Sequence, residues 1–247
     1  MDIIYYILKN KGGILMLGVI VNTATIIAGG AIGLLVKKGI PEKLNKSIMD
    51  ALALVVIYMG ISGALKGDNP LYVIICMCIG VVIGELIDID KLLNNFGILI
   101  DKRLSKDDNL EEDANNLSKG FVSASLLYCV GAMAVVGAIQ SGLSGEHSTL
   151  FAKSILDGVS SIFFAASMGL GVILSSIAVF LYEGVIALGA GALSSILKET
   201  VITYMTCVGS ILIMAMGLNM LGMCKIKVAN LLPSMFIPII LGIFNII

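Results

Sequence analysis

The chain has 247 residues, of which 58% are hydrophobic and 13% are charged, and its mean hydropathy is +1.03. Soluble domains carry about 25% charged residues, so this composition excludes an ordinary soluble protein and predicts an all-α, polytopic bundle of transmembrane helices. The net charge of −1 gives nucleic acid no basic surface to bind, and the lipid bilayer is the first expected partner.

The first fifteen residues, "MDIIYYILKNKGGIL", form an N-terminal extension over 1–15. This stretch has charge after its apolar part and no small-residue cleavage site, so we expect that it is not removed as a signal peptide. Two interpretations remain open: an interfacial segment, or a start codon assigned too early with the functional start at Met16.

A helix needs roughly 20 apolar residues to cross the hydrocarbon core. The apolar runs predict about eight spans. The fifth and sixth are separated only by "MGLG" at 168–171, which leaves seven as the alternative count. The predicted spans are 16–36, 48–65, 70–88, 120–141, 153–170, 172–193, 201–222 and 228–246.

A polar linker over 89–119, with its most hydrophilic part at 101–119, divides the first three spans from the others. With eight spans, most Lys and Arg residues fall on the side of this linker, which predicts that the linker is cytoplasmic and that both termini are outside. The expected location is the bacterial cytoplasmic (inner) membrane. The richer side holds Lys37, Lys38, Lys43, Lys46, Lys91, Lys102, Arg103, Lys106, Lys119, Lys225 and Lys227, and the other side holds Lys9, Lys11, Lys66, Lys153 and Lys198.

Two parts of the chain resemble each other. The stretch "GVIVNTATIIAGGAIGLLV" from Gly18 aligns with "GVILSSIAVFLYEGVIALGAGAL" from Gly171, and "MGISGAL" aligns with "MGLNML". These matches indicate a first repeat over 16–88 and a second over 171–247, with two connecting spans over 120–170. In the eight-span arrangement the repeats have inverted topology, which is typical of secondary transporters.

Charged and polar residues inside the spans are the candidate site residues, because an intramembrane charge costs several kcal/mol and needs a partner or a cavity. Lys153 and Asp157 are four residues apart and share one helix face, either as a shallow ion pair at the outer rim or as part of a polar pathway. The small residues around Gly29–Gly30 allow either close helix packing or a loosened helix that lines a cavity. The predicted substrate or ion pathway consists of Asn22, Thr23, Glu85, Gln140, Lys153, Asp157, Ser175, Ser176 and Glu183.

The five cysteines are scattered in apolar runs, and His147 is the single histidine. We expect no metal site and no cofactor, and no motif for catalysis or nucleotide binding predicts an enzyme.

Three stretches carry a family resemblance: "MLGVIVNTATIIAGGAIGLLVKKGIPEKL", "YCVGAMAVVGAIQSGLSGEHSTLFAKSILDGVSSI" and "ANLLPSMFIP". They resemble the bacterial membrane family catalogued as domain of unknown function 554. The resemblance implies a multi-spanning inner membrane protein, often described as a transporter, without an established substrate. Members of that family usually begin at the equivalent of Met16. The family pattern is expected to have Gln where this chain has Glu183, which argues against a proton carrier at that position throughout the family.

Two function classes remain. The first is a secondary transporter or exporter of an unidentified small solute or ion, with a midplane polar site between the repeats and with Glu85 and Asp157 near its gates. The second is a non-transporting membrane scaffold or regulatory subunit; a channel is a third, less favoured class. A transporter predicts helices interrupted around Gly29–Gly30 and Ser175–Ser176, whereas a scaffold predicts continuous helices. A homo-oligomer is compatible with either class.

Overall fold

The computed structural model of the protein describes residues 15–37, 41–93, 95 and 110–247, and in these residues all regular structure is helical. Residues 1–14 of the predicted N-terminal extension and residues 96–109 of the polar linker lie outside the described residues. The helices are α3 (Leu17–Lys37), α4 (Glu42–Ala64), α5 (Pro70–Ile87), α7 (Leu110–Cys129), α8 (Ala132–Ser144), α9 (Ser148–Met168), α10 (Gly171–Leu188), α11 (Ala190–Leu193), α12 (Glu199–Met220), α13 (Val228–Leu231), the 3₁₀ helix η1 (Leu232–Phe236) and α14 (Ile237–Ile243).

Among the described residues, six helices are long and apolar enough to cross a membrane, or seven if the bent pair of α7 and α8 counts as one. The prediction of eight spans is therefore not confirmed. The predicted last span, 228–246, is divided among α13, η1 and α14, where Pro233 and Pro238 each stand at a helix start. The "MGLG" turn does separate two helices, because α9 ends at Met168 and α10 begins at Gly171.

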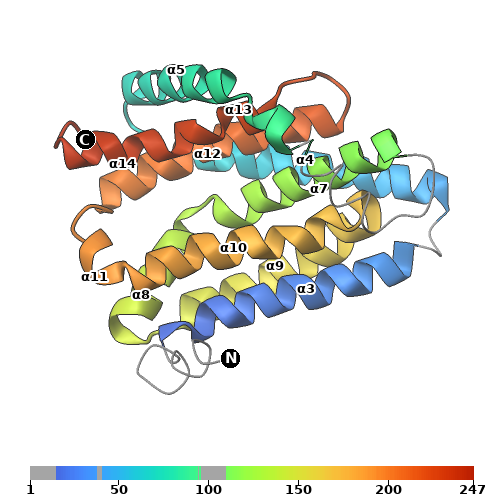
Figure 1. The fold of residues 1–247 in the computed structure, drawn as a ribbon, viewed down its shortest axis with the longest axis horizontal. Helices are drawn as coiled ribbons and strands as arrows, with labels where there is room; N and C mark the ends of the chain where they lie inside the picture. The colour runs from blue at the N-terminus through green and yellow to red at the C-terminus, as the bar shows by residue number, and fades with distance from the viewer. Residues whose placement is uncertain (1–14, 38–40, 94, 96–109) are drawn as a thin grey trace.

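The long helices run roughly along one common direction (Figure 1). The start of α3, the α8–α9 turn, α11 and the C-terminus lie at one end of the bundle, and the α9–α10 turn and the α12–α13 loop lie at the other. α7 and α8 together return the chain from the end where α5 finishes to the end where α9 begins. With this return, α3 and α9 run in the same direction.

α3 packs along α9 at very short range because glycines line the contact. A Cβ atom added at Gly29 would lie 2.1 Å from the Gly158 carbonyl oxygen, and one added at Gly33 would lie 2.2 Å from that of Ile162. Small residues allow this approach, which is how helices associate within a bilayer. α3 runs unbroken through Gly29 and Gly30, and α10 runs unbroken through its serines. At these two positions the structure therefore has the continuous helices that the scaffold class predicts, not the interruptions that the transporter class predicts, and Gly29 and Gly30 are used for packing.

The interruption that the structure does contain lies between α7 and α8. The helix axes bend there by 62°. Gly131 stands at the bend with φ of 134°, a backbone conformation that other residues rarely adopt. Gly145, whose φ of 69° is left-handed, follows the last residue of α8 and begins the short turn into α9. The α7–α8 segment is therefore a discontinuous helix inside the bundle.

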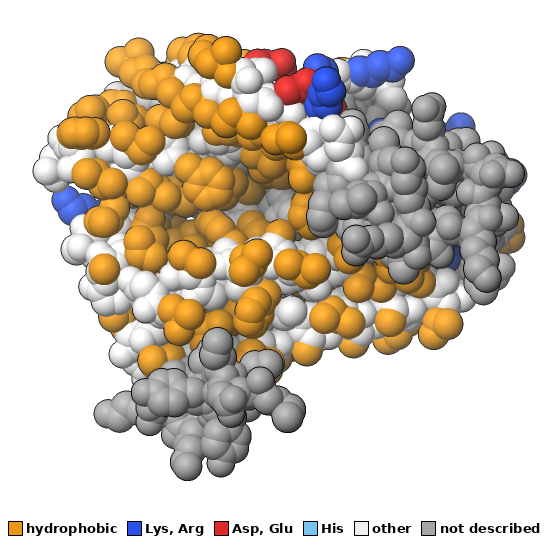
Figure 2. All heavy atoms as spheres, in the orientation of Figure 1, with side chains coloured by type: hydrophobic (Ala, Val, Ile, Leu, Met, Phe, Trp, Pro, Cys, Tyr) orange, Lys and Arg blue, Asp and Glu red, His pale blue; other side chains and the backbone are white. Residues whose placement is uncertain are grey.

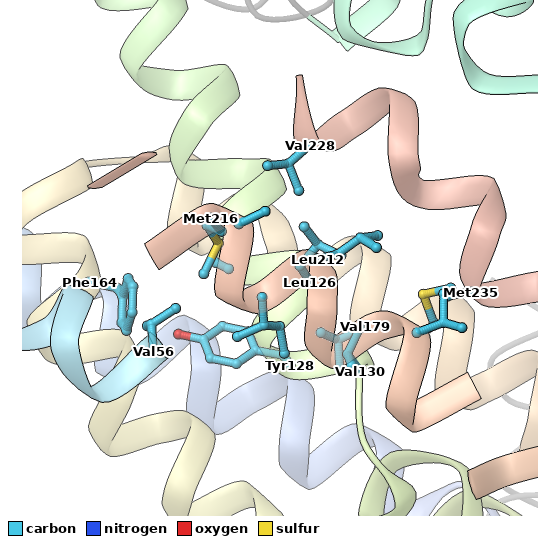
Figure 3. Close-up of a cluster of buried hydrophobic side chains, with 14 of the residues drawn as sticks. Val56, Leu126, Tyr128, Val130, Phe164, Val179, Leu212, Met216, Val228 and Met235 are labelled. Atoms are coloured by element: carbon cyan, nitrogen blue, oxygen red, sulfur yellow. The ribbon is translucent and has the colours of Figure 1, made fainter. Parts of the chain in front are cut away.

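The core lies where α7, α9, α10 and α12 meet, and Figure 3 shows Leu126, Tyr128, Phe164, Val179 and Leu212 around one centre. Large apolar side chains also cover the outside, including Leu86 at 82% exposed and Tyr58 at 71%. Figure 2 shows hydrophobic side chains over most of one face. An apolar exterior of this extent fits a bundle surrounded by lipid.

Candidate functional site

Three helices bring four of the predicted residues together in the interior. Asn22 of α3 donates a hydrogen bond from Nδ2 to Oε1 of Glu183 in α10, at 2.9 Å. Lys153 of α9 donates to Asp157 one turn further along the same helix, and its Nζ lies 3.7 Å from Oε1 of Glu183. We call Asn22, Lys153, Asp157 and Glu183 the buried polar cluster.

The buried polar cluster is deeply enclosed. Glu183 and Asn22 are 0% exposed, Lys153 is 5% exposed and Asp157 is 7% exposed. α9 begins at Ser148, five residues before the predicted start of the span, so Asp157 lies near the helix midpoint, about 14 Å from its first residue. The interpretation of Lys153 and Asp157 as a shallow pair at the rim was therefore wrong, because the predicted span was begun at the charge itself.

Within the described parts of the chain, two acceptor atoms of the cluster have no hydrogen-bond donor. These are Oδ1 of Asn22 and Oε2 of Glu183, both fully enclosed by protein. Since Nδ2 and Oε1 of the same two side chains are already bonded to each other, the unpartnered atoms belong to one amide–carboxyl pair. A buried acceptor without a donor costs roughly 1–3 kcal/mol, so a proton shared between these two atoms would stabilise the pair.

The α7 side of the cluster was not predicted. The Tyr128 hydroxyl lies 2.9 Å from Oγ of Ser161, one turn beyond Asp157 on α9. Cys129 follows Tyr128 on α7 and is half-buried. Both α7 residues directly precede the bend at Gly131, so the discontinuous helix ends beside the charges. In the sequence, Tyr128 and Gly131 stand close together within the predicted span 120–141, and this pattern could have indicated Tyr128 and Cys129 as site residues.

The other predicted residues lie around the cluster or away from it. Thr23 donates to the Val19 carbonyl and Ser175 donates to the Val172 carbonyl, so both hydroxyls are used within their own helices. Ser176 is buried on the α10 face that holds Glu183, two turns away. Gln140 accepts a hydrogen bond from Thr149 at the α8–α9 turn. Glu85 is exposed on α5 and does not join the cluster.

A cavity of about 730 Å³ opens at the opposite end of α9 from its first residue. It reaches Ser167 and Met168, and Ser161 precedes Ser167 by about 9 Å along α9. Lys153, Asp157 and Ser161 recur every fourth residue, so they form a polar stripe on α9 that leads from the cluster toward this cavity.

Comparison with known proteins identifies relatives along nearly the whole chain. A family described as "Protein of unknown function (DUF554)" matches residues 17–243. The chain is 33% identical over 231 residues to the uncharacterized membrane protein YdfK of Bacillus subtilis, covering 90% of this chain and 94% of YdfK. It is 25% identical over 223 residues to the uncharacterized protein YqgA of Escherichia coli, again covering 90% of this chain and 94% of the relative. No solved structure matches.

Proposed function

The chain belongs to the DUF554 family of membrane proteins of unknown function, and from this chain's own Glu183, where the family pattern is expected to have Gln, we propose that it is a proton-coupled secondary transporter of a small solute or ion. The Asn22–Glu183 pair is its proton site. Within this proposal the protein lies in the bacterial cytoplasmic membrane and is not an enzyme.

The charge balance of the buried polar cluster is the observation that carries the proposal. Lys153 provides one positive charge, while Asp157 and Glu183 provide two carboxylates within the same enclosed volume. An uncompensated buried charge costs several kcal/mol in a protein interior. The cluster is therefore neutral only when it also holds one proton or one monovalent cation.

A proton on Oε2 of Glu183 resolves both the charge and the hydrogen bonding. The protonated group donates to Oδ1 of Asn22 while Nδ2 of Asn22 donates to Oε1, so the two side chains form a closed acid–amide pair. One proton thus satisfies both unpartnered atoms and leaves Lys153 balanced by Asp157. When the proton leaves, the negative charge returns beside Lys153, and this change in electrostatics is the coupling step.

Helix packing supports an inverted repeat around this site. Each helix of the first repeat contacts its counterpart: α3 lies against α10, α4 against α12, and α5 against α13 and η1. In the α4–α12 contact a Cβ at Gly60 would lie 2.6 Å from the Met214 nitrogen, and one at Gly217 would lie 2.6 Å from Cγ1 of Ile57. Since "MGISGAL" and "MGLNML" align Gly60 with Gly217 and Ile57 with Met214, these contacts are reciprocal, as a two-fold axis requires. The proton site then lies between equivalent helices, where such transporters bind.

Lysine positions support an orientation with the α9–α10 turn in the cytoplasm. Among the described residues, that end of the bundle holds most of the lysines outside the core, and the other end holds Lys66 and Lys198. Positive residues are enriched in cytoplasmic loops. The end with the α9–α10 turn carries Lys37, Lys43, Lys46, Lys91, Lys119, Lys225 and Lys227.

The test compares a deletion strain with strains that produce the wild type, Glu183→Gln or Glu85→Gln. Metabolite and ion profiles identify the solute pool that the wild type restores, and everted vesicles then show whether that solute dissipates an imposed pH gradient. We expect wild type and Glu85→Gln to respond and Glu183→Gln to fail. A Glu183→Gln protein that dissipates the gradient as the wild type does would refute proton coupling at this site. Profiles that deletion leaves unchanged would favour the scaffold class.

A further inference from the structure

The cavity at the cytoplasmic end carries a strong positive charge. Lys37, Lys119, Lys225 and Lys227 line it from α3, α7 and the α12–α13 loop, and Ser118 and Asn219 add neutral polar groups. All four lysines are exposed, and no ion pair joins any of them to an acidic residue within the described parts of the chain. Asp90 is the carboxylate among the described lining residues. The lining therefore favours an anionic ligand.

An apolar groove adjoins this cavity. The groove has a volume of about 300 Å³ and shares Val122 with the cavity. Its lining is almost entirely hydrophobic and includes Phe121, Leu126, Ala178, Tyr182 and Leu232. On the face seen in Figure 2 the hydrophobic surface is hollowed. A small polar anion would leave this apolar groove unfilled.

The dimensions match one membrane leaflet. The groove follows α7 from Phe121 to Cys129, about 12 Å along the helix. The hydrocarbon region of a leaflet is about 15 Å deep, half of the bilayer core. Lys37 ends α3, and Lys119 lies on α7 just before the part of that helix that lines the groove. Basic pockets between transmembrane helices bind anionic headgroups.

We propose that the cavity and the groove together bind one anionic phospholipid of the cytoplasmic leaflet. The lysines hold its phosphate and an acyl chain lies along the groove on α7. The same chain then contacts Cys129 and Val130, which precede the bend at Gly131. None of the four residues of the buried polar cluster lines this site, so lipid binding can be measured separately from the proton site.

Thermal unfolding of the full chain in detergent tests the proposal with three probes: dioctanoyl phosphatidylglycerol, dioctanoyl phosphatidylcholine and glycerol phosphate. We expect the first to raise the unfolding temperature in a saturable way, and the zwitterionic lipid and the chainless anion to have much weaker effects. Glycerol phosphate as effective as phosphatidylglycerol would show a site for free anions and overturn the lipid assignment. Equal effects of the two lipids would show that charge plays no part and would also overturn it.

Lysine variants locate the site. Each lysine near an anionic surface contributes about 1 kcal/mol, which is about fivefold in affinity. Lys225→Gln with Lys227→Gln should therefore weaken phosphatidylglycerol binding by about 25-fold, whereas Lys66→Gln with Lys198→Gln, at the opposite end, should leave it unchanged. Equal losses in the two double variants would refute the location.

Ala178→Phe, which fills the groove, should remove the advantage of the dioctanoyl lipid over glycerol phosphate, and a retained advantage would refute the groove assignment. Ala178→Ser, the matched small substitution, should keep it.

Discussion

Glu183→Gln separates the two charge states of the buried polar cluster through stability alone. Glutamine has the shape of a protonated glutamic acid, so it accepts from Nδ2 of Asn22 and donates to Oδ1 of the same residue. If Glu183 holds a proton at rest, the variant keeps both hydrogen bonds and leaves Lys153 paired with Asp157. If Glu183 is ionised, the variant removes a carboxylate that lies 3.7 Å from the Lys153 nitrogen.

The two cases differ in free energy by an amount that can be measured. At 3.7 Å and an effective dielectric constant near 20, the attraction of an ionised Glu183 for Lys153 is about 4 kcal/mol. Lys153 keeps Asp157 in the variant, so removing an ionised Glu183 also removes the uncompensated negative charge of the cluster, and the variant would then be more stable than the wild type. Exchanging one hydrogen-bonded neutral group for another changes stability by less than about 1 kcal/mol. We expect this small change, because the unpartnered Oε2 and Oδ1 atoms fit the protonated form.

The assay is reversible unfolding in mixed micelles at neutral pH, with Glu85→Gln as the matched control on an exposed carboxylate. Infrared spectroscopy adds an independent measurement: a buried protonated carboxyl gives a carbonyl stretch that shifts on deuteration and is lost in Glu183→Gln. A Glu183→Gln protein more stable than the wild type, together with no such band in the wild type, would refute the protonated pair and the coupling mechanism built on it.

Three further predictions test the environment of the site and its supports. Asp157→Asn removes the partner of a buried lysine and should destabilise the fold by roughly 3–5 kcal/mol in the same unfolding assay; adding Lys153→Met should recover much of this loss, and no recovery would contradict the pairing. Gly84→Ala places a Cβ 1.8 Å from the Asn230 carbonyl oxygen and should lower the free energy of unfolding by about 1–3 kcal/mol. In the control Gly191→Ala, the added Cβ meets no atom within 4 Å, so the free energy of unfolding should hardly change. Equal effects of the two substitutions would show that the contact at Gly84 relaxes freely. Asp68 lies in the loop after α4, and the hydrogen bond from the Tyr204 hydroxyl lowers the pKa of its carboxyl. The ionised carboxyl therefore stabilises the fold at pH values above its pKa in the unfolded chain. This stabilisation is lost as the pH falls through the lowered pKa of the folded state. Tyr204→Phe should therefore reduce the loss of stability on acidification, measured as the unfolding midpoint at a series of pH values, and an unchanged acid dependence would exclude this contribution.

The sequence predicted which residues form the site better than it predicted how they are arranged. Intramembrane cost alone singled out Lys153, Asp157 and Glu183, because charges are rare in apolar runs. It did not pair Asn22 with Glu183, since 161 residues separate them and only the packing of α3 on α10 brings them together. The depth of Asp157 was missed because a charge was taken to end a span, whereas a buried partner allows a charge within one. Gly29 can pack or loosen a helix equally well, and only the carbonyl of Gly158 opposite it decides for packing.

The unequal burial of the helices has a consequence for biogenesis. α4 and α5 leave the ribosome early, yet the segments they pack against, α12, α13 and η1, are made more than a hundred residues later. In the finished bundle only 22% of the α4 span and 17% of the α5 span are buried, compared with 78% of α12. The early helices can thus wait in lipid without partners, as stable solitary spans. α9 cannot, since it brings Lys153 and Asp157 into the bilayer, but its close partner α3 is already there when it emerges. The order of synthesis therefore places α3 in the membrane before α9, the helix that brings two charges into the bilayer.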